Sequence, residues 1–555
     1  MTTLIFILLM ITAILLMFII VSNFGNAVVI LRGGSSSEEF IQGEIELSDL
    51  STRISRTSGS SARESGTSGQ DNGASVSDLS TGSPDYKGMN ADITVGVYGD
   101  AEICTMFMSQ MEVMKQTYKE VSTLSADDEF TLLIIDGSLL NGDADAEIIE
   151  ELCRNGTSVF LTSLPEHVSE KLMTVCGIKR VGKKRTWPGL RVSSDLLSGY
   201  LIEEPDYEVE GVSVELDPGT KVYASALPLG YDDIDNDDLP HLFWRHIPYE
   251  DSGSVYVCCG SFGMSETACA FLPSILSELC GNYIYGVINA YCVAADGFPF
   301  GVNAENENWQ RFYSRDKSSI ALDMLQPQYD RYSITYGAEI SYFTDDYDIF
   351  MTTSDSSLLY FKNAAESDNG KLFERKDGEM LIGNVATFDT WQPSFSFIDN
   401  GGTRLKLPVS FTYTVDNHEP DNFAVPGYVL GIGFYSVLFD VDDFLEYDGE
   451  KEVWSEYCSD QETVLGIHER DYGYLERVTA DEAAQRLYNL LVADVETVYG
   501  ENSVTVKNAD GLSFMLRTDM KEMKITGGAM EQAADDIYLI RAESDEVIIT
   551  GEALK

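Results

Sequence analysis

The chain has 555 residues, of which 44% are hydrophobic, and it is long enough for two or three domains that each bury a core. Its 91 acidic and 37 basic residues give a formal net charge of −54 at pH 7. A surface this acidic is repelled by nucleic acid and by anionic membranes, so nucleic acid is excluded as a partner. It suits a cationic partner, a divalent cation, or simply solubility at high ionic strength.

The first 90 residues predict a membrane anchor and a tether. Residues 3–21 are uncharged and almost entirely apolar, and at about 1.5 Å per residue they can cross a bilayer. No convincing cleavage site follows, so residues 1–32 are predicted to be an uncleaved signal anchor with one transmembrane helix. Residues 33–90 are rich in Ser, Gly and Thr, which predicts a disordered tether. Because a tether has little use on a cytoplasmic enzyme, we expect a single-pass protein of the cell membrane with a large extracytoplasmic part.

Residues 91–298 predict an α/β domain with a parallel sheet. Apolar runs such as "ITVGVYG", "FTLLIID" and "TSVFLTSLP" alternate with helical patterns. The runs are continuously apolar, as in sheets covered by helices on both faces. The order "LLIIDGSLL…NGTSVFLTSLPEHVSEKLMTVCGI" resembles the flavodoxin-like fold of class I glutamine amidotransferases.

That resemblance implies a nucleophilic cysteine at a strand end, and this chain has none at the matching place. The strand leads instead to Leu161, Thr162 and Ser163, and the later "CCGSFGM" places its glycines around Ser261. We therefore expect this domain to bind or to scaffold. The nine cysteines of the chain are an odd number with no Cys-x-x-Cys pair, which predicts buried free thiols.

The segment Lys179–Arg191, "KRVGKKRTWPGLR", concentrates six basic residues and a tryptophan. It could meet phosphate headgroups or an anionic partner. The alternative, which we favour, is a solvated β-hairpin or loop that offsets the acidity around it.

Residues 299–499 mix strands, helices and short acidic turns, and residues 500–555 predict a small all-β module. One helix is expected to begin after Thr479, with Glu482 completing a capping box. The stretch "VATFDTW", Val385 to Trp391, differs by one residue from Thr-Phe-Asp-Asp, the metal-binding opening of polysaccharide deacetylases. Asp389 lies about 90 residues into this domain, too late for an opening motif, so we interpret the stretch as a strand end.

The whole arrangement resembles a bacterial family that combines a membrane anchor, an amidotransferase-like domain, a divergent (β/α) barrel of polysaccharide-deacetylase type and a C-terminal β segment. The resemblance is carried by stretches spread over residues 93–550, among them "LLIIDGSLL", "GSVYVCCGSFG", "IGFYSVLFDVDD" and "YGYLERVTADEAAQRLY". Members of this family occur beside genes for Pel-like exopolysaccharide synthesis and export. The resemblance implies a role in exopolysaccharide and biofilm production, with an amino-sugar-containing polymer and membrane synthesis or export subunits as partners.

A deacetylase of this type needs one Asp and two His around a divalent metal, with the two His one helical turn apart, and a second carboxylate as base. No two of the five histidines are spaced i, i+4, so we assign no metal site and expect a divalent metal only if deacetylase activity is retained. Candidate catalytic residues without a definite role are Asp345, Asp346, Asp389, His418 and His468.

Aromatic and acidic side chains of the same region could form a carbohydrate-binding cleft, with rings stacked on sugar faces and carboxylates bonded to hydroxyl groups. The candidates are Trp309, Tyr342, Trp391, Tyr435 and Asp440. The alternative for each ring is a place in the core.

The leading hypothesis is a membrane-tethered protein that binds or guides a cationic amino-sugar polymer without catalysis. A surface with net charge −54 attracts such a polymer in a salt-dependent way. The alternative is an enzyme on the same polymer, either a deacetylase or a glycoside hydrolase, since hydrolysis needs only two carboxylates about 5–10 Å apart. Cell-wall binding unrelated to exopolysaccharide is a third hypothesis.

Overall fold

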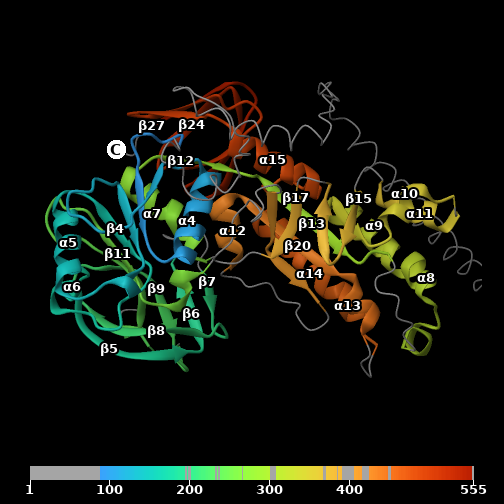
Figure 1. Cartoon of the computed structure of the whole chain (residues 1–555), viewed down its shortest axis with the longest axis horizontal. Coiled ribbons are helices and arrows are strands. Elements are labelled where there is room, and N and C mark those ends of the chain that lie inside the picture. The colour runs from blue at the N-terminus through green and yellow to red at the C-terminus, as the bar shows by residue number, and fades with distance from the viewer. Residues whose placement is uncertain are drawn as a thin grey trace, which may run out of the picture. The chain divides into compact units, whose positions relative to one another are not determined.

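A computed structural model describes residues 88–193, 197, 202–231, 234–235, 238–265, 267–299, 308–354, 356–366, 370–383, 386–390, 405–414, 424–447 and 452–552 (Figure 1). All of them belong to one compact unit, Leu50–Lys555. The predicted anchor and residues 33–87 of the predicted tether lie outside the described residues. The last three residues assigned to the tether, 88–90, are buried and belong to the folded part instead. Within the described ranges, no helix is long and apolar enough to span a membrane.

The first part of the chain forms a nine-stranded sheet in the order β2-β1-β3-β4-β11-β10-β9-β6-β7. Its first five strands are parallel: β1 (Val95–Tyr98), β2 (Tyr118–Glu120), β3 (Leu132–Ile135), β4 (Ser158–Leu161) and β11 (Val255–Cys258). The other four are antiparallel: β6 (Gly189–Val192), β7 (Ile202–Glu204), β9 (Lys221–Leu227) and β10 (His241–His246). The predicted parallel arrangement is thus confirmed for the first five strands, whereas the antiparallel half was not predicted and the amidotransferase likeness stays a prediction.

The central strands of the parallel half, β3 and β4, are continuously apolar and are buried at every position. Such strands are typical of a sheet that helices cover on both faces. The helices of this part are α4 (Ala101–Met114), α5 (Asp143–Arg154), α6 (Glu170–Val175) and α7 (Thr267–Cys280), with short helical turns η1 (Gly137–Leu139) and η4 (Ser261–Met264). All nine cysteines are free thiols, and seven of them are buried, as predicted.

The basic segment is largely a solvated strand, and several of its charges are paired. It includes most of β5 (Ile178–Trp187), which pairs only with β8 (Val209–Leu216) in a two-stranded antiparallel sheet. Glu215 on β8 lies 2.8 Å from Lys179 and 2.9 Å from Arg180, and Lys184 lies 2.9 Å from Glu210. The favoured interpretation, a solvated segment that offsets local acidity, agrees with these cross-strand ion pairs.

The second part forms an eight-stranded, barrel-like sheet in the order β18-β17-β16-β15-β14-β13-β20-β19. Its strands are β13 (Ala290–Asp296), β14 (Ile340–Thr344), β15 (Gly370–Lys376), β16 (Glu379–Ile382), β17 (Ala386–Thr390), β18 (Leu405–Val409), β19 (Phe411–Tyr413) and β20 (Phe434–Asp440). The edge strands β18 and β19 follow each other in the chain, separated only by Ser410. The backbone N–H of Ser410 donates to Ser436 Oγ (2.9 Å) on β20, so one bent segment brings the two edges of the sheet together.

This sheet differs from the predicted (β/α) barrel in two ways. Strand β13 begins at Ala290, before the boundary predicted at residue 299. Strands β15, β16 and β17 run antiparallel. The reason for the β15–β16 hairpin is local: Asp377 and Gly378 both have positive φ (53° and 84°), as a two-residue turn between antiparallel strands requires.

The helices of this part lie between neighbouring strands of the sheet or follow its last strand, β20. They are α8 (Lys317–Ile320), α9 (Gln326–Tyr336), α10 (Tyr347–Thr352), α11 (Ser356–Ala365), α12 (Ala424–Ile432), α13 (Val441–Glu446), α14 (Trp454–Asp471) and α15 (Ala480–Val492), with π-helical turns η5 (Trp309–Tyr313) and η6 (Ala321–Leu325). Helix α15 begins after Thr479, as predicted, but the capping box does not form. Thr479 Oγ1 contacts Asp481, and Glu482 pairs with Arg486 (2.7 Å) instead.

The C-terminal part is all-β, as predicted, and forms two four-stranded sheets. One has the order β21-β22-β27-β24 and the other β12-β23-β26-β25. The strands are β21 (Glu496–Gly500), β22 (Ser503–Lys507), β23 (Ser513–Arg517), β24 (Lys521–Thr526), β25 (Gly528–Ala534), β26 (Ile537–Ala542) and β27 (Glu546–Glu552), joined by β12 (Tyr283–Val287). Strand β12 precedes the barrel in sequence and pairs with β23, so it joins the C-terminal sheet to the middle of the chain.

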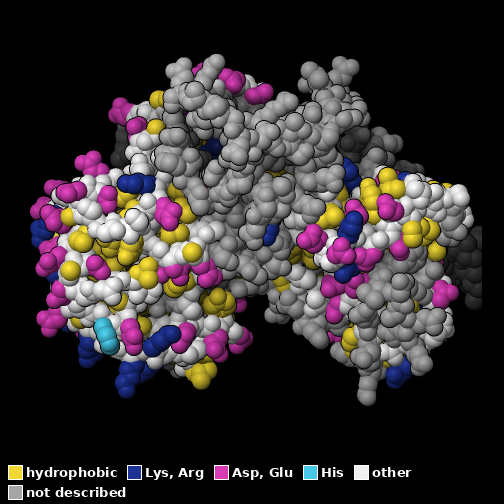
Figure 2. Space-filling view, in the orientation of Figure 1, with side chains coloured by type: hydrophobic (Ala, Val, Ile, Leu, Met, Phe, Trp, Pro, Cys, Tyr) yellow, Lys and Arg dark blue, Asp and Glu magenta, His cyan; other side chains and the backbone are white. Residues whose placement is uncertain are grey.

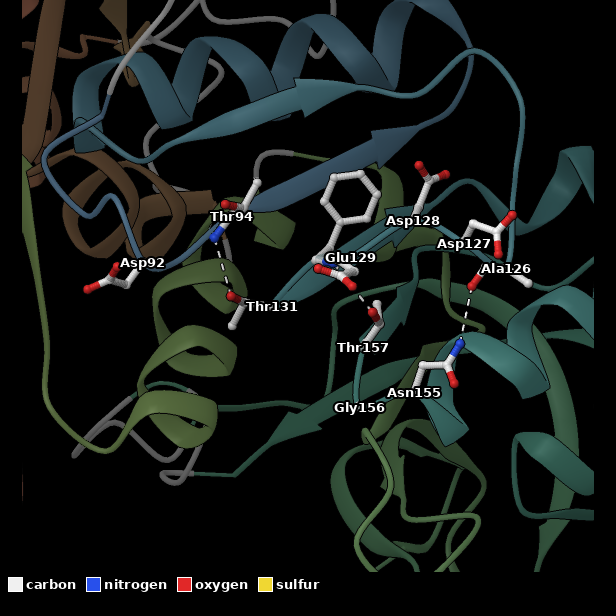
Figure 3. Close-up of a pocket in the computed structure, with 11 residues that line it drawn as sticks. Asp92, Thr94, Ala126, Asp127, Asp128, Glu129, Thr131, Asn155, Gly156 and Thr157 are labelled. Atoms are coloured by element: carbon white, nitrogen blue, oxygen red, sulfur yellow. Dashed lines mark hydrogen bonds between the residues drawn. The ribbon is translucent and has the colours of Figure 1, made fainter.

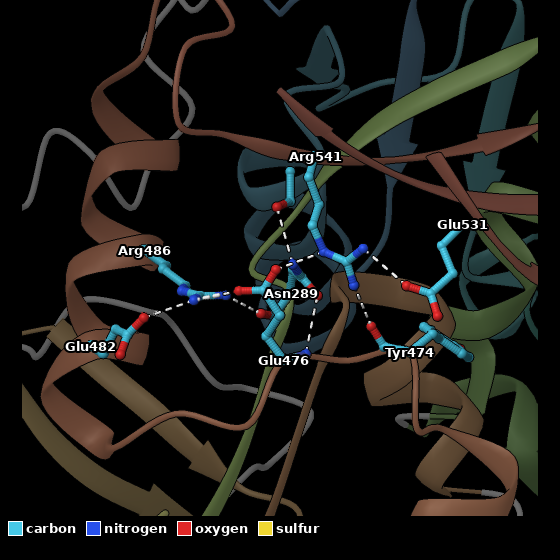
Figure 4. A network of polar contacts seen from close by, with 8 residues as sticks. Asn289, Tyr474, Glu476, Glu482, Arg486, Glu531 and Arg541 are labelled. Carbon is cyan, nitrogen blue, oxygen red and sulfur yellow. Dashed lines mark hydrogen bonds and ion pairs between the residues drawn. The ribbon is translucent and has the colours of Figure 1, made fainter. Parts of the chain in front are cut away.

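A polar network ties the barrel to the C-terminal strands (Figure 4). Glu476 pairs with Arg486 of α15 and with Arg541 of β26, both at 2.6 Å. Arg486 Nη1 also donates to the backbone oxygen of Asn289 (2.6 Å), directly before β13, and Arg541 pairs with Glu531 (2.9 Å). Burial raises the pKa of Glu476, but the two arginines outweigh it and lower the pKa overall.

Candidate functional site

Four carboxylates gather where the parallel strands of the barrel end. Strands β13, β14 and β20 run parallel, so their carboxyl ends lie at one edge of the sheet, and Asp296 is directly opposite Asp440. Asp345 follows β14, and Asp442 lies in the first turn of α13. Active sites of barrels of parallel strands form at this edge, so it is the first place to look for chemistry.

The guanidinium of Arg375, on β15, lies among these carboxylates. Its Nη1 is 2.5 Å from Asp442 Oδ2 and 3.8 Å from Asp345 Oδ2, and its Nε is 3.4 Å from Asp296 Oδ1. Asp440 caps α13, with its Oδ1 accepting a hydrogen bond from the backbone N–H of Asp443 (3.0 Å). The cluster is therefore organised around an internal cation.

Burial sets the protonation of Asp296. The side chain is only 16% exposed, and its Oδ1 accepts no hydrogen bond from any described residue, because the nearby Arg375 Nε lacks the required geometry. Burial raises the pKa of Asp296 to about 6; Arg375 opposes this rise, and the neighbouring Asp440 and Asp442 add to it. Burial raises the pKa of Asp440 as well. A carboxyl group with a pKa near 6 can act as a general acid or base near neutral pH.

Glycine allows the turn after β13 to approach the cluster. Gly297 has a φ of +76°, and a Cβ there would lie 2.4 Å from Asp442 Oδ1. Any other residue at this position would therefore displace Asp442 from Arg375.

The cluster does not fit a divalent metal. Oxygens of Asp296, Asp345 and Asp442 that could bind a cation face the guanidinium of Arg375. Among the described residues, no group of three or more His, Cys, Asp or Glu side chains is placed to hold a metal ion.

The predicted histidine candidates do not join this edge. His468 lies on α14 and stacks on Tyr291, with ring centroids 3.3 Å apart, and further from Tyr435 (5.9 Å). Tyr291 and Tyr435 lie near the amino ends of β13 and β20, so His468 packs at the opposite end of the strands from Asp296. Burial lowers the pKa of His468 well below its usual value, which fits a neutral core side chain. His418 lies outside the described residues.

The remaining predicted residues have mixed outcomes. "VATFDTW" does end a strand, because Asp389 belongs to β17, while Trp391 lies outside the described residues. Asp345 lies at the cluster, and Asp346 precedes α10, its backbone N–H donating to Thr344 Oγ1 (3.2 Å). Asp440 belongs to the cluster through its place opposite Asp296.

The predicted sugar-stacking rings that the structure describes are core residues. Trp309, Tyr342 and Tyr435 are at most 5% exposed, so none offers a ring face to solvent. Tyr342 packs on Phe298 with ring centroids 4.5 Å apart. Aromatic content alone could not separate these packed rings from a binding cleft.

The sequence analysis missed Asp296 and Arg375. The signal for Asp296 was present: "YCVAADG" is an apolar run that ends in an Asp-Gly pair, as expected at the carboxyl end of a buried strand. Arg375 gave no comparable signal, since it lies far from Asp296 in sequence.

An acidic pocket lies on the nine-stranded sheet, at the amino ends of β1, β3 and β4 (Figure 3). It has a volume of about 510 Å³, and four carboxylates but no Lys or Arg line it: Asp92, Asp127, Asp128 and Glu129. The walls are held by short hydrogen bonds, such as that from Asn155 Nδ2 to the backbone oxygen of Ala126 (3.2 Å). The pocket suits a cationic group.

No protein-family model and no curated protein matches the chain. Among solved structures, Agd3, a carbohydrate deacetylase, aligns with a TM-score of 0.44 and 10% identity over 83% of this chain and 99% of that one. A ThuA-like protein from Bacteroides uniformis aligns with a TM-score of 0.26 and 11% identity over 39% and 96%. A β-galactosidase from Rahnella sp. R3 aligns with a TM-score of 0.25 and 12% identity over 35% and 33%. At these TM-scores no functional inference rests on the likenesses.

Proposed function

We propose that this protein is a membrane-tethered, extracytoplasmic component of Pel-like exopolysaccharide biosynthesis or export that binds a cationic amino-sugar polymer without catalysis. One observation carries the proposal: the chain has 91 acidic against 37 basic residues, and many of the basic side chains already form internal ion pairs. Figure 2 shows carboxylates spread over the visible face, with fewer Lys and Arg between them. Ammonium groups of a deacetylated polymer would find unneutralised carboxylates over much of this surface.

The acidic pocket gives the polymer a local contact. No Lys or Arg is among the described residues that line it, so the charged groups of the pocket wall that an ammonium group would meet are carboxylates. Such attraction between exposed charges is screened by salt, with a Debye length of about 10 Å at 0.1 M. Binding should therefore weaken steeply as ionic strength rises.

The barrel supports binding rather than catalysis. At the edge where such folds place their chemistry, the carboxylates face Arg375, which leaves a fixed cation in the middle of the cluster. A carboxylate held by a guanidinium 2.5 Å away is less available as a base or as a metal ligand.

Retention of the full-length protein on immobilised, partly deacetylated N-acetylglucosamine polymer tests the proposal. We expect retention at low salt and elution as salt rises. A pocket variant, Asp127→Asn/Asp128→Asn/Glu129→Gln, should elute at clearly lower salt. The matched control, Asp519→Asn/Glu522→Gln/Glu543→Gln, changes the net charge equally at exposed sites on the C-terminal part and should elute close to the parent. Absence of salt-sensitive retention of the parent would refute the proposal.

The alternative function, a carbohydrate-active enzyme, rests on Asp296. Its carboxyl group is buried at a barrel strand end with a pKa of about 6, next to Asp440. Release of acetate or of new reducing ends from the polymer, abolished in Asp296→Asn but kept in Asp345→Asn, would favour the enzyme over the binding protein.

A further inference from the structure

A second pocket lies at the carboxyl ends of β4 and β11, the opposite edge of the nine-stranded sheet from the acidic pocket. It has a volume of about 550 Å³, within the range of roughly 300–1,000 Å³ that small-molecule sites occupy. The loop after β4 contributes Ser163, Glu166 and Val168, and the turn after β11 contributes Ser261. Crevices outside the carboxyl ends of parallel strands are where open α/β sheets bind ligands.

The two-stranded sheet β5–β8 forms one wall of this pocket, and hydrogen bonds join β8 to the turn after β11. The backbone N–H of Val212 donates to Cys259 O (3.2 Å), and that of Glu210 donates to Ser261 Oγ (3.3 Å). A Cβ at Gly211 would lie 2.9 Å from the Cys259 oxygen, so glycine permits this close approach. The pocket is therefore built into the fold rather than left between loops.

The charges that line the pocket leave one carboxylate uncompensated. Three charged side chains line it, and two of them, Lys184 and Glu210, pair with each other at 2.9 Å. The third, Glu166, is exposed and forms no ion pair or side-chain hydrogen bond with the described part of the chain. Leu164 and Val168, from the same loop as Glu166, belong to the apolar lining of the pocket, here called its aliphatic wall. A matching ligand carries one positive charge, hydroxyl groups and an apolar face.

We propose that this pocket binds a single amino-sugar unit, with its ammonium group on the Glu166 carboxylate and the C–H face of its ring on the aliphatic wall. The inference deepens the proposed function and rests on it, since it assigns a defined site to one unit of the polymer. Ser261 Oγ accepts a hydrogen bond from the backbone N–H of Glu210. Its own hydroxyl proton can be donated to a hydroxyl group of the sugar.

Titration of the full-length protein with a glucosamine disaccharide, followed by calorimetry, tests this site. We expect Glu166→Gln to weaken binding at least tenfold, and Val168→Trp, which fills the pocket, to abolish it. The matched control, Glu170→Gln, removes an exposed carboxylate four residues away on α6 and should leave the affinity unchanged.

Three results would overturn the inference: equal binding of the N-acetylated disaccharide, equal binding of methylammonium, or an unchanged affinity in Glu166→Gln. If the disaccharide fails these tests while the polymer column still retains the protein in a salt-sensitive way, only the pocket assignment fails. Loss of retention on the polymer itself would instead remove the proposed function.

Discussion

Replacing Asp296 by asparagine should change the stability of the protein in a pH-dependent way. Compared with the parent, the variant should gain stability as the pH rises from acidic to neutral. In the folded chain the pKa of this carboxyl group is about 6, against 3.8 for an unperturbed aspartic acid. The folded state therefore holds the proton more tightly than the unfolded state. The stabilising contribution of the protonated group is complete below pH 3.8 and is lost as pH rises through the folded pKa.

The size of the effect follows from the shift. About two pKa units correspond to about 3 kcal/mol across the whole window, and to about 2 kcal/mol between about pH 4.5 and about pH 7.5. Asparagine keeps the shape of the side chain but has no proton to exchange. The difference in unfolding free energy, Asp296→Asn minus parent, should thus rise by about 2 kcal/mol over that interval.

Urea unfolding of the full-length protein at the two pH values measures this difference. Asp345→Asn is the matched control, because it makes the same chemical change beside the same arginine on a side chain that is 53% exposed. Its effect should stay within about 1 kcal/mol, as for exposed ion pairs. A difference for Asp296→Asn that is constant, or that falls as pH rises, would show that burial does not govern this carboxyl group.

Three further predictions, each made with substitutions, test the structure. Arg375→Gln leaves Asp296 and Asp442 without their cation and should cost about 3 kcal/mol of unfolding free energy; a cost below about 1 kcal/mol would contradict the ion-pair geometry. Glu476→Gln weakens two ion pairs of the half-buried network and should cost about 1 kcal/mol, whereas Glu531→Gln at its rim should cost less. His468→Phe keeps the stack on Tyr291 and should change stability by less than about 1.5 kcal/mol, while His468→Ala should cost about 2–4 kcal/mol; equal costs would argue against a packing role.

The patterns that predicted the fold correctly are local ones. Continuous apolar runs marked β1, β3 and β4, and Thr479 marked the start of α15, because each signal depends on residues within one element. The Asp-Gly pair at residues 377–378 was an equally local hairpin signal, which the expectation of a divergent (β/α) barrel, taken from the family resemblance, did not include.

Local patterns could not predict the cluster at the barrel edge, because its residues lie far apart in the sequence. Asp442 meets Arg375 across 67 residues, and both meet Asp296 only because three parallel strands end at the same edge. In a chain with 91 acidic residues, no single carboxylate stands out before the fold brings it beside an arginine. The aromatic candidates Tyr342 and Tyr435 are buried in the core, so their rings cannot stack on a sugar.

The dissociation constant of the full-length protein for amino-sugar polymers of equal length and graded acetylation addresses the proposed function most simply. If carboxylates capture ammonium groups, affinity rises with the fraction of free amines and falls as salt is added. An affinity that is unchanged or higher for the fully acetylated polymer would mean that the acidic surface does not recognise a cationic chain.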